Sequence, residues 1–204
     1  MIRLYGIRAS RAARCIWMLE ELGLEYENVP VSFLGDAQKP EYLAINPNGR
    51  VPALVDDDGT VVWESLAINL YLAEKYDRGL RPRSAAERGH ALQWSFWAAT
   101  EVESGVVDAF VHRVMLPEGQ RDAAIADAGE AKLQRPLPVL DRHLAERSYL
   151  LGEAFTVADL NVCSVLGIAR VARIDLAKQP HVQRWLAACL SRPAAQKAFG
   201  PFSG

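Results

Sequence analysis

The strongest constraint on the fold of this chain is the point at which its strand-like segments stop. Beyond residue 84 we find no convincing strand pattern, whereas before it β-rich runs occur at residues 2–6, 26–31, 50–55 and 60–63. A polar stretch with glycine and proline, residues 77–84, separates the two parts and is typical of a linker. The sequence therefore predicts a small α/β domain followed by an all-helical one.

The residue pattern of the first part predicts a strand, then a helix, then a second strand. Between residues 10 and 22 apolar side chains recur every three or four positions, at Ala12, Cys15, Ile16, Leu19 and Leu22, which predicts an amphipathic helix. Two strands joined by a helix form a parallel pair. The segment Asp56–Gly59 then indicates a hairpin between two β-rich runs, and a further helix is expected from Ser65 to Tyr76.

The second part consists of helical patterns. We expect long helices over residues 87–115 and 120–144, the latter broken near Pro136 and Pro138, and further helices over residues 157–171, 180–190 and 194–199. Thr156 and Asp159 have the spacing of a capping box. The predicted boundaries are residues 1–78 for the α/β domain, 79–86 for the linker and 87–204 for the helical domain.

Composition excludes several classes of function. With 50% hydrophobic and 24% charged residues and a net charge of −2, the 204-residue chain has no basic field to hold nucleic acid or an anionic membrane. No apolar run approaches the ~18 residues of a membrane span, and the N-terminus lacks the pattern of a signal peptide. Three scattered cysteines indicate a reducing, cytoplasmic setting. Four isolated histidines and the absence of a glycine-rich phosphate loop favour neither a metal site nor a nucleotide site.

Ser10 is the first residue that could carry chemistry. It lies where the first strand gives way to the first helix, close to free N–H groups and the positive end of that helix. A hydroxyl there could stabilise an anion. The alternative is that Ser10 only caps the helix.

The segment NPNGRVPAL, residues 46–54, is the second candidate, because Pro52 interrupts a β-rich run. A cis Val51–Pro52 bond would turn the N–H and C=O of Val51 outward, toward an extended peptide-like ligand. The alternative is a trans proline in an edge strand.

Glu64 and Ser65 are the third candidate, at the end of a strand and the start of a helix. Free N–H groups at that point favour a carboxylate, and Glu64 could accept from an ammonium. The alternative is a capping serine beside a solvated acid.

Taken together, these segments resemble the cytosolic glutathione transferase superfamily. The resemblance covers essentially the whole chain and is carried by SRAARCIWMLEELGLEYE, NPNGRVPAL, VVWESLAINLYLAEKY and YLLGEAFTVADLNV. It implies a thioredoxin-like N-terminal domain that binds glutathione and an all-α C-terminal domain that contributes a second-substrate pocket. It also implies a cytoplasmic, homodimeric detoxification enzyme that uses glutathione as co-substrate, with no tightly bound cofactor and no metal.

The resemblance also assigns roles to individual residues. In a serine-type site, Ser10 donates a hydrogen bond to the glutathione sulfur, while Val51, before a cis Pro52, pairs with the cysteinyl part. Glu64 and Ser65 hold the γ-glutamyl end. The glycine carboxylate would meet Arg50, together with Gln38 or Lys39.

Three further expectations concern Tyr5, the helical half and the reaction. Tyr5 is a rival to Ser10 for the sulfur, the alternative being a core residue of the first strand. In the helical half, Val106 and Phe110 are expected at the second-substrate pocket. The expected reaction is conjugation of the glutathione thiolate to small hydrophobic electrophiles; the alternatives are a glutathione-dependent peroxidase or isomerase, and a non-catalytic glutathione-binding or regulatory module.

Overall fold

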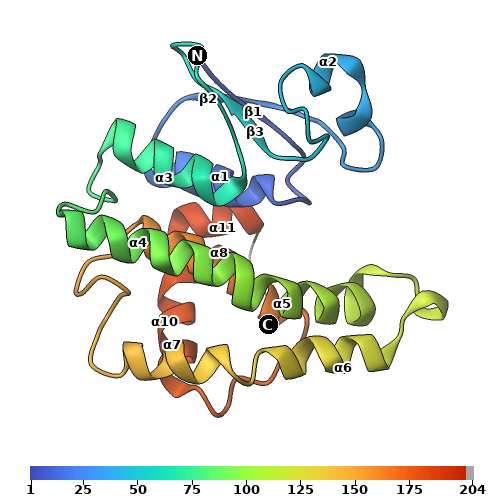
Figure 1. The fold of residues 1–204 in the computed structure, drawn as a ribbon, viewed down its shortest axis with the longest axis vertical. Helices are drawn as coiled ribbons and strands as arrows, with labels where there is room; N and C mark the ends of the chain where they lie inside the picture. The colour runs from blue at the N-terminus through green and yellow to red at the C-terminus, as the bar shows by residue number, and fades with distance from the viewer. Residues whose placement is uncertain (201–204) are drawn as a thin grey trace. The chain divides into compact units, whose positions relative to one another are not determined.

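The computed structural model describes residues 1–200, which belong to two compact units (Figure 1). One consists of Met1–Arg81 together with the segment that begins at Arg192, and the other of Pro82–Ser191. The boundary after Arg81 falls inside the predicted linker. The C-terminal segment groups with the α/β unit, whereas the predicted helical domain extended to residue 204; residues 201–204 lie outside the described part.

The α/β unit contains a four-stranded sheet in the order β2-β1-β3-β4. Its strands are β1 (Ile2–Tyr5), β2 (Tyr26–Val29), β3 (Ala53–Val55) and β4 (Val61–Trp63). β1 pairs in parallel with β2 and antiparallel with β3, and β3 pairs antiparallel with β4. This pairing confirms both the parallel pair and the hairpin predicted from the sequence.

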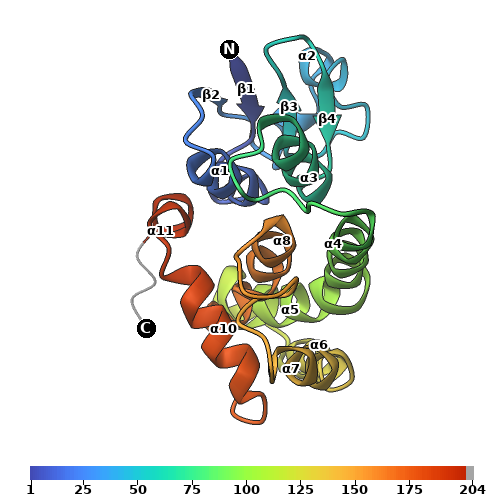
Figure 2. The same ribbon diagram turned by 90° about the vertical axis from the view of Figure 1, so that its left-hand side faces the viewer.

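Helices α1 (Ala12–Glu21) and α3 (Ser65–Tyr76) lie side by side against one face of the sheet (Figure 2). A 3₁₀ turn, Asp36–Gln38, and the short α2 (Pro40–Leu43) follow β2. Since side chains alternate along a strand, Leu4 and Tyr5 point to opposite faces of the sheet. Tyr5 belongs to a buried cluster completed by Val31, Ala37, Tyr42 and Ala53.

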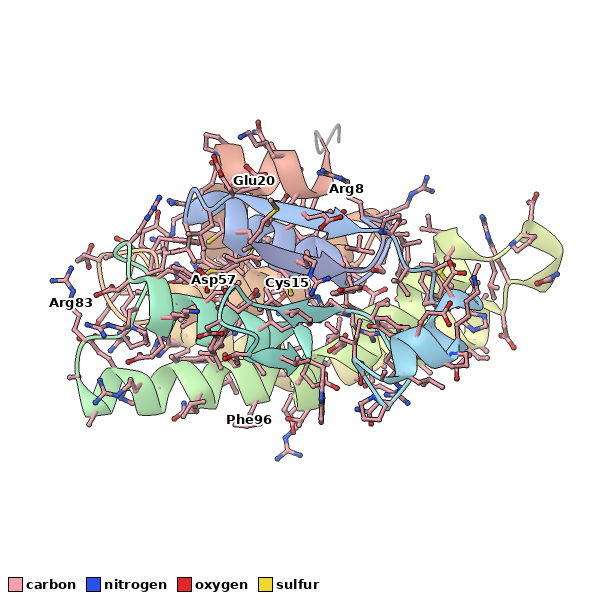
Figure 3. The ribbon with its side chains drawn as sticks, turned by 90° about the horizontal axis from the view of Figure 1, so that it is seen from above. Arg8, Cys15, Glu20, Asp57, Arg83 and Phe96 are labelled. Atoms are coloured by element: carbon pink, nitrogen blue, oxygen red, sulfur yellow. The ribbon has the colours of Figure 1, made fainter. Side chains whose placement is uncertain are left out.

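The last helix, α11 (Pro193–Phe199), packs on α1. The rings of Trp17 and Phe199 meet edge to face, with centroids 5.8 Å apart. Arg192 donates two hydrogen bonds to the carboxylate of Glu21, at 2.6 and 2.7 Å. Figure 3 shows Arg8 and Glu20 near this helix, and Arg8 donates to the carbonyls of residues 197 and 198. These contacts are why the C-terminal segment belongs to the α/β unit.

The helical unit contains seven α-helices among its described residues. They are α4 (Ala85–Trp97), α5 (Glu103–Phe110), α6 (Ala123–Lys132), α7 (Pro136–Leu144), α8 (Val157–Leu166), α9 (Ile168–Val171) and α10 (Pro180–Leu190). A π-helical turn, Ala98–Val102, joins α4 to α5, and a second one, Val111–Met115, extends α5. A 3₁₀ turn spans Glu118–Gln120. The break predicted near Pro136 and Pro138 is confirmed: α6 ends at Lys132, and α7 begins at Pro136 and contains Pro138.

Helix α8 forms the centre of this unit, because all ten of its residues are buried. The capping box predicted at its start is present, with Thr156 and Asp159 bonded reciprocally. Asp159 also accepts from the N–H of Leu150 at 2.7 Å and from Nε1 of Trp185 at 2.9 Å. Within residues 1–200 no helix is both long enough and apolar enough to cross a bilayer.

Candidate functional site

Gly6 brings two of the predicted site residues together. It follows β1 with a φ of +142°, a region that side chains rarely allow. A Cβ placed there would lie 2.7 Å from Cβ of Ala12, 3.4 Å from Cβ of Val51 and 3.6 Å from Oγ of Ser10. Because Gly6 has no side chain, the loop before α1 can approach the segment before β3. Ser10 and Val51 therefore both lie next to Gly6.

The Ser10 hydroxyl is half-buried and already engaged in its own loop. It donates to the carbonyl of Ile7 at 2.6 Å and accepts from the N–H of Ala12 at 3.2 Å. The capping alternative holds in part: the oxygen satisfies an N–H at the start of α1, although Arg11 occupies the cap position. A thiolate near Ser10 would compete with Ile7 for the hydroxyl proton.

The Val51–Pro52 peptide bond is cis, so the alternative of a trans proline is wrong. Among the described residues, neither the N–H nor the C=O of Val51 has a hydrogen-bond partner. Since Val51 is only half-buried, both groups are available to a ligand that offers an extended backbone.

A network of side chains holds the loop that leads to Val51. Tyr42 Oη and Nδ2 of Asn46 both donate to the carbonyl of Arg50, at 2.7 and 2.6 Å. Gln38 Nε2 donates to the carbonyl of Gly49 at 2.8 Å. Gln38 therefore supports the loop backbone, as do Tyr42 and Asn46. The sequence did not single out these last two as individual residues, although Asn46 begins the NPNGRVPAL segment.

Arg50 and Lys39 differ in their surroundings. Both side chains are exposed, but Lys39 forms an ion pair with Asp36 at 2.7 Å. In the described part of the chain the guanidinium of Arg50 has no such partner. Of the two cations, Arg50 is the one available to a carboxylate, and its planar donor fork suits that group.

Glu64 has an unusual backbone for a non-glycine residue, with φ +73° and ψ 114°. Such conformations cost of order 1–3 kcal/mol and concentrate at functional sites. Glu64 occupies the N-cap position of α3 without a side-chain capping bond. Ser65 is the first residue of the helix, so the alternative in which Ser65 caps α3 is wrong. The Glu64 carboxylate is exposed and has no partner within residues 1–200.

Two consecutive side chains of α1 form hydrogen bonds to Ser65. Nη1 of Arg14 donates to Oγ of Ser65 at 3.4 Å, and the thiol of Cys15, labelled in Figure 3, donates to the carbonyl of Ser65 at 3.6 Å. Burial raises the pKa of the Cys15 thiol well above its usual range, although Arg14 opposes the shift. Cys15 is therefore an inert core thiol, as its position in the apolar stripe predicts.

Tyr5 is the rival sulfur ligand, and its surroundings are those of the core. Its side chain is 8% exposed, and its ring lies 6.2 Å from that of Tyr42. The structure therefore favours the alternative of a packed strand residue.

The two residues expected at a second-substrate pocket lie on α5 but differ in accessibility. Val106 is 0% exposed, so it has no surface to offer a substrate and belongs to the core of the helical unit. Phe110 is half-buried at the end of α5. A residue's place on a helix follows from the sequence, but which side of the helix is covered depends on the packing of other helices.

One acidic cluster in the described chain has the geometry to hold a cation. Oxygen atoms of Asp56, Asp57 and Asp58 lie within 4.8 Å of one another. The ammonium of Lys75 is 2.9 to 3.0 Å from a carboxylate oxygen of each. The ammonium of Lys75 thus compensates the negative charge of these carboxylates. Their ion pairs connect the hairpin turn to the C-terminal end of α3.

Comparison with known proteins gives the family. Residues 1–74 match the model of the glutathione S-transferase N-terminal domain, and residues 102–193 match that of the C-terminal domain. Glutathione S-transferase 3 of Zea mays is 38% identical over 96% of this chain and 92% of its own length. The chain belongs to the glutathione S-transferase family. It is an enzyme of that family.

Two further comparisons extend over the whole glutathione S-transferase fold. The glutathione S-transferase GstB of Escherichia coli is 32% identical over 97% of each chain. The solved structure of the theta class glutathione S-transferase from Xanthomonas axonopodis pv. citri, with glutathione bound, superposes with a TM-score of 0.90. It is 34% identical to this chain and covers 98% of it, while this chain covers 97% of that one. The thioredoxin-like and all-helical fold class predicted from the sequence is confirmed.

Proposed function

We propose that the α/β unit binds glutathione in an extended conformation, with its cysteinyl backbone paired to Val51 and its sulfur beside Ser10. The observation that carries the proposal is the free N–H and C=O of Val51, held next to Ser10 across Gly6. A bound tripeptide with its backbone on Val51 has its thiol near the N-terminus of α1, where an anion is favoured.

The two ends of the tripeptide have separate partners in this proposal. At the γ-glutamyl end, the unpartnered Glu64 carboxylate accepts from the α-ammonium, and Ser65 and the first N–H groups of α3 bind the α-carboxylate. At the other end, Arg50 binds the glycine carboxylate. Lys39 adds positive charge from a position next to Asp36, and Gln38 acts through the backbone of Gly49.

Ser10 stabilises the thiolate by donating a hydrogen bond to it and does not act as a base. Lowering a thiol pKa from ~8.5 to ~6.5 requires about 2.7 kcal/mol. A hydrogen bond to a charged group contributes roughly 1.5–3 kcal/mol, and the end of α1 contributes roughly another 0.3–1 kcal/mol. The two together suffice, so the thiolate is present near neutral pH and attacks an electrophile.

The remaining assignments concern the second substrate and the assembly. We propose a small hydrophobic electrophile as the second substrate, with Phe110 as one contact in a pocket contributed by the helical domain, residues 87–204, beyond a linker at residues 79–86. We also propose a homodimer. We propose that it works in the cytoplasm, in accord with three buried cysteines that form no disulfide within the described residues.

One set of measurements separates this function from its alternatives. Calorimetry with glutathione tests binding, and the ultraviolet signal of the thiolate tests activation. A panel of aryl halides and hydroperoxides then distinguishes transferase from peroxidase activity, and an unsaturated ketone tests for isomerisation. Binding without a thiolate near neutral pH would identify a non-catalytic module, and the absence of any heat with glutathione would refute the proposed site.

A further inference from the structure

Ser10 is the last residue of a β-turn, Ile7–Ser10, whose tip is exposed. The N–H of Ser10 donates to the carbonyl of Ile7 at 3.1 Å, the bond that closes such a turn, and the Ser10 hydroxyl donates to the same carbonyl. Arg8 and Ala9 are the two central residues, and both are exposed. The conformation of this turn therefore decides where the Ser10 hydroxyl lies.

Backbone hydrogen bonds hold the two ends of this turn. Ahead of it, the N–H of Gly6 donates to the carbonyl of Val29 on β2 at 3.0 Å. After it, the N–H of Ala13 on α1 donates to the carbonyl of Ser10 at 3.1 Å. These bonds fix the ends of the turn and leave its exposed tip to be held by a side chain.

Arg8 attaches the tip of the turn to the C-terminal end of α11 (Figure 3). Its Nη1 donates to the backbone carbonyls of Lys197 and Ala198, to the latter at 3.4 Å. Both carbonyls belong to the last turn of α11, Pro193–Phe199, where the carbonyls lack partners inside the helix. A basic side chain can satisfy such carbonyls, so this contact stabilises both the end of the helix and the tip of the turn.

Helix α11 is itself fixed to α1 by two acidic residues of α1. Arg192 donates two hydrogen bonds to the carboxylate of Glu21, and Nζ of Lys197 lies 3.0 Å from a carboxylate oxygen of Glu20. The contacts form a closed ring, because the turn leads into α1, α1 holds α11, and α11 holds Arg8. The tip of the turn is thus supported by a residue that lies 189 positions from Arg8 in the sequence.

We propose that Arg8 is a positioning residue for Ser10, through which α11 contributes to stabilising the bound thiolate. This inference rests on the proposed function. By attaching the turn to α11, Arg8 keeps the Ser10 hydroxyl where a sulfur held beside Val51 can accept its hydrogen bond. A hydrogen bond weakens steeply as its angle departs from linear, so a loosened turn would stabilise the thiolate less.

Arg8→Met tests the proposal by ultraviolet titration of the bound thiolate. We expect the pKa of the thiol to rise by roughly 0.3 to 1, less than in Ser10→Ala, because the hydroxyl remains and only its placement is loosened. If the wild-type pKa is ~6.5, the thiolate fraction at pH 6.5 falls about 1.5- to 5-fold, and kcat with an aryl halide falls with it.

Affinity for the tripeptide separates this role from direct binding. The probe is S-methylglutathione, which has no thiol to ionise, so its Kd does not depend on thiolate stabilisation. Calorimetry should give a Kd within about twofold of wild type in Arg8→Met. A Kd raised tenfold or more would mean that Arg8 contacts the tripeptide, and would overturn the inference.

A double variant shows whether Arg8 acts through Ser10. Once the hydroxyl is absent, its placement no longer matters, so Ser10→Ala and the double variant with Arg8→Met should have thiol pKa values within roughly 0.2 of each other. A further rise as large as the one in the wild-type background would assign the effect to the charge of Arg8 itself. A difference between wild type and Arg8→Met that disappears between about 0.05 and 0.5 M NaCl would have the same meaning. Either result would overturn the inference.

Arg78→Met is the matched control. Arg78 is also an exposed arginine of the α/β unit, and it donates to a backbone carbonyl, that of Gly23, at 3.2 Å, beyond the other end of α1. Its loss should leave the thiol pKa and kcat at their wild-type values. Arg8→Lys keeps the charge but offers a single donor group, so its thiol pKa should lie between those of wild type and Arg8→Met.

The outcomes for this inference and for the proposed function are distinct. If wild type gives no heat with glutathione, the proposed function fails. If wild type binds glutathione and lowers its thiol pKa, but Arg8→Met titrates as wild type does, only the inference fails. Should Arg8→Met not fold, Arg8→Lys decides the matter, and a thiol pKa equal to that of wild type would refute the role of Arg8.

Discussion

Replacing Ser10 by alanine is the most direct test of how the thiolate is stabilised. The substitution removes one hydroxyl, which in the unliganded protein donates to the carbonyl of Ile7 at 2.6 Å and accepts from the N–H of Ala12. With glutathione bound, the same proton would be donated to the sulfur. Losing a hydrogen bond of roughly 1.5–3 kcal/mol to a charged group raises the thiol pKa by about 1 to 2 units.

The consequence for activity depends on pH. If the wild-type thiol has a pKa of ~6.5, the variant has ~7.5 to ~8.5, so the thiolate fraction near pH 6.5 falls about 5- to 50-fold. Well above pH 8.5 both proteins hold mostly thiolate, and the difference in rate should shrink to a small factor. Glutathione affinity should change little, because Val51, Glu64, Ser65 and Arg50 remain.

The assay is a pH profile of kcat with an aryl halide, together with ultraviolet titration of the bound thiolate. Tyr5→Phe is the matched control, since it also removes a single hydroxyl; we expect it to leave the titration unchanged because the ring belongs to the buried cluster. A thiolate that survives in Ser10→Ala and disappears in Tyr5→Phe would reverse the assignment. A loss of rate that is equal at all pH values would show that Ser10 acts on something other than the thiol pKa.

Three further predictions concern Glu64, Arg192 and Asp56. Glu64→Gly removes the strain of a φ of +73°, so urea denaturation should show an unchanged free energy of unfolding or a gain of up to about 1 kcal/mol. Calorimetry should show the Kd for glutathione raised about tenfold. A lower free energy of unfolding would contradict the idea that the Glu64 backbone is strained. Arg192→Met breaks the two hydrogen bonds to Glu21 and should lower the free energy of unfolding by about 1–2 kcal/mol in the same assay, whereas Arg88→Met on α4 is the control. Although burial raises the pKa of Asp56, hydrogen bonds from Lys75, Tyr71 and Tyr76 lower it well below its ordinary value. Its stabilising contribution is therefore full above about pH 4 and is lost as pH falls toward the folded-state pKa, so the advantage of wild type over Asp56→Asn should decline between pH 7 and pH 3; an advantage independent of pH would contradict this.

Much of the fold could be predicted because its signals are local. The apolar stripe of α1, the Asp-Gly turn before β4 and the capping box at Thr156 each depend on residues within a few positions of one another. The structure confirms these elements with small shifts at their ends. The candidate site also lies in contiguous motifs, so Ser10, Val51 and Glu64 could be selected before their positions in space were known.

Tertiary structure alone decided what those residues do to one another. Only packing shows that Arg14 reaches Ser65, which is 51 residues away, or that α11 joins α1 across more than 170 positions. Val106 and Phe110 lie four residues apart in the same predicted helix. In the structure, however, Val106 is fully buried and Phe110 is half-buried. Backbone periodicity is set by neighbours along the chain, whereas burial and hydrogen-bond partners are set by whichever surfaces meet in the folded state. The pattern of one segment holds no information about the surface that will cover it.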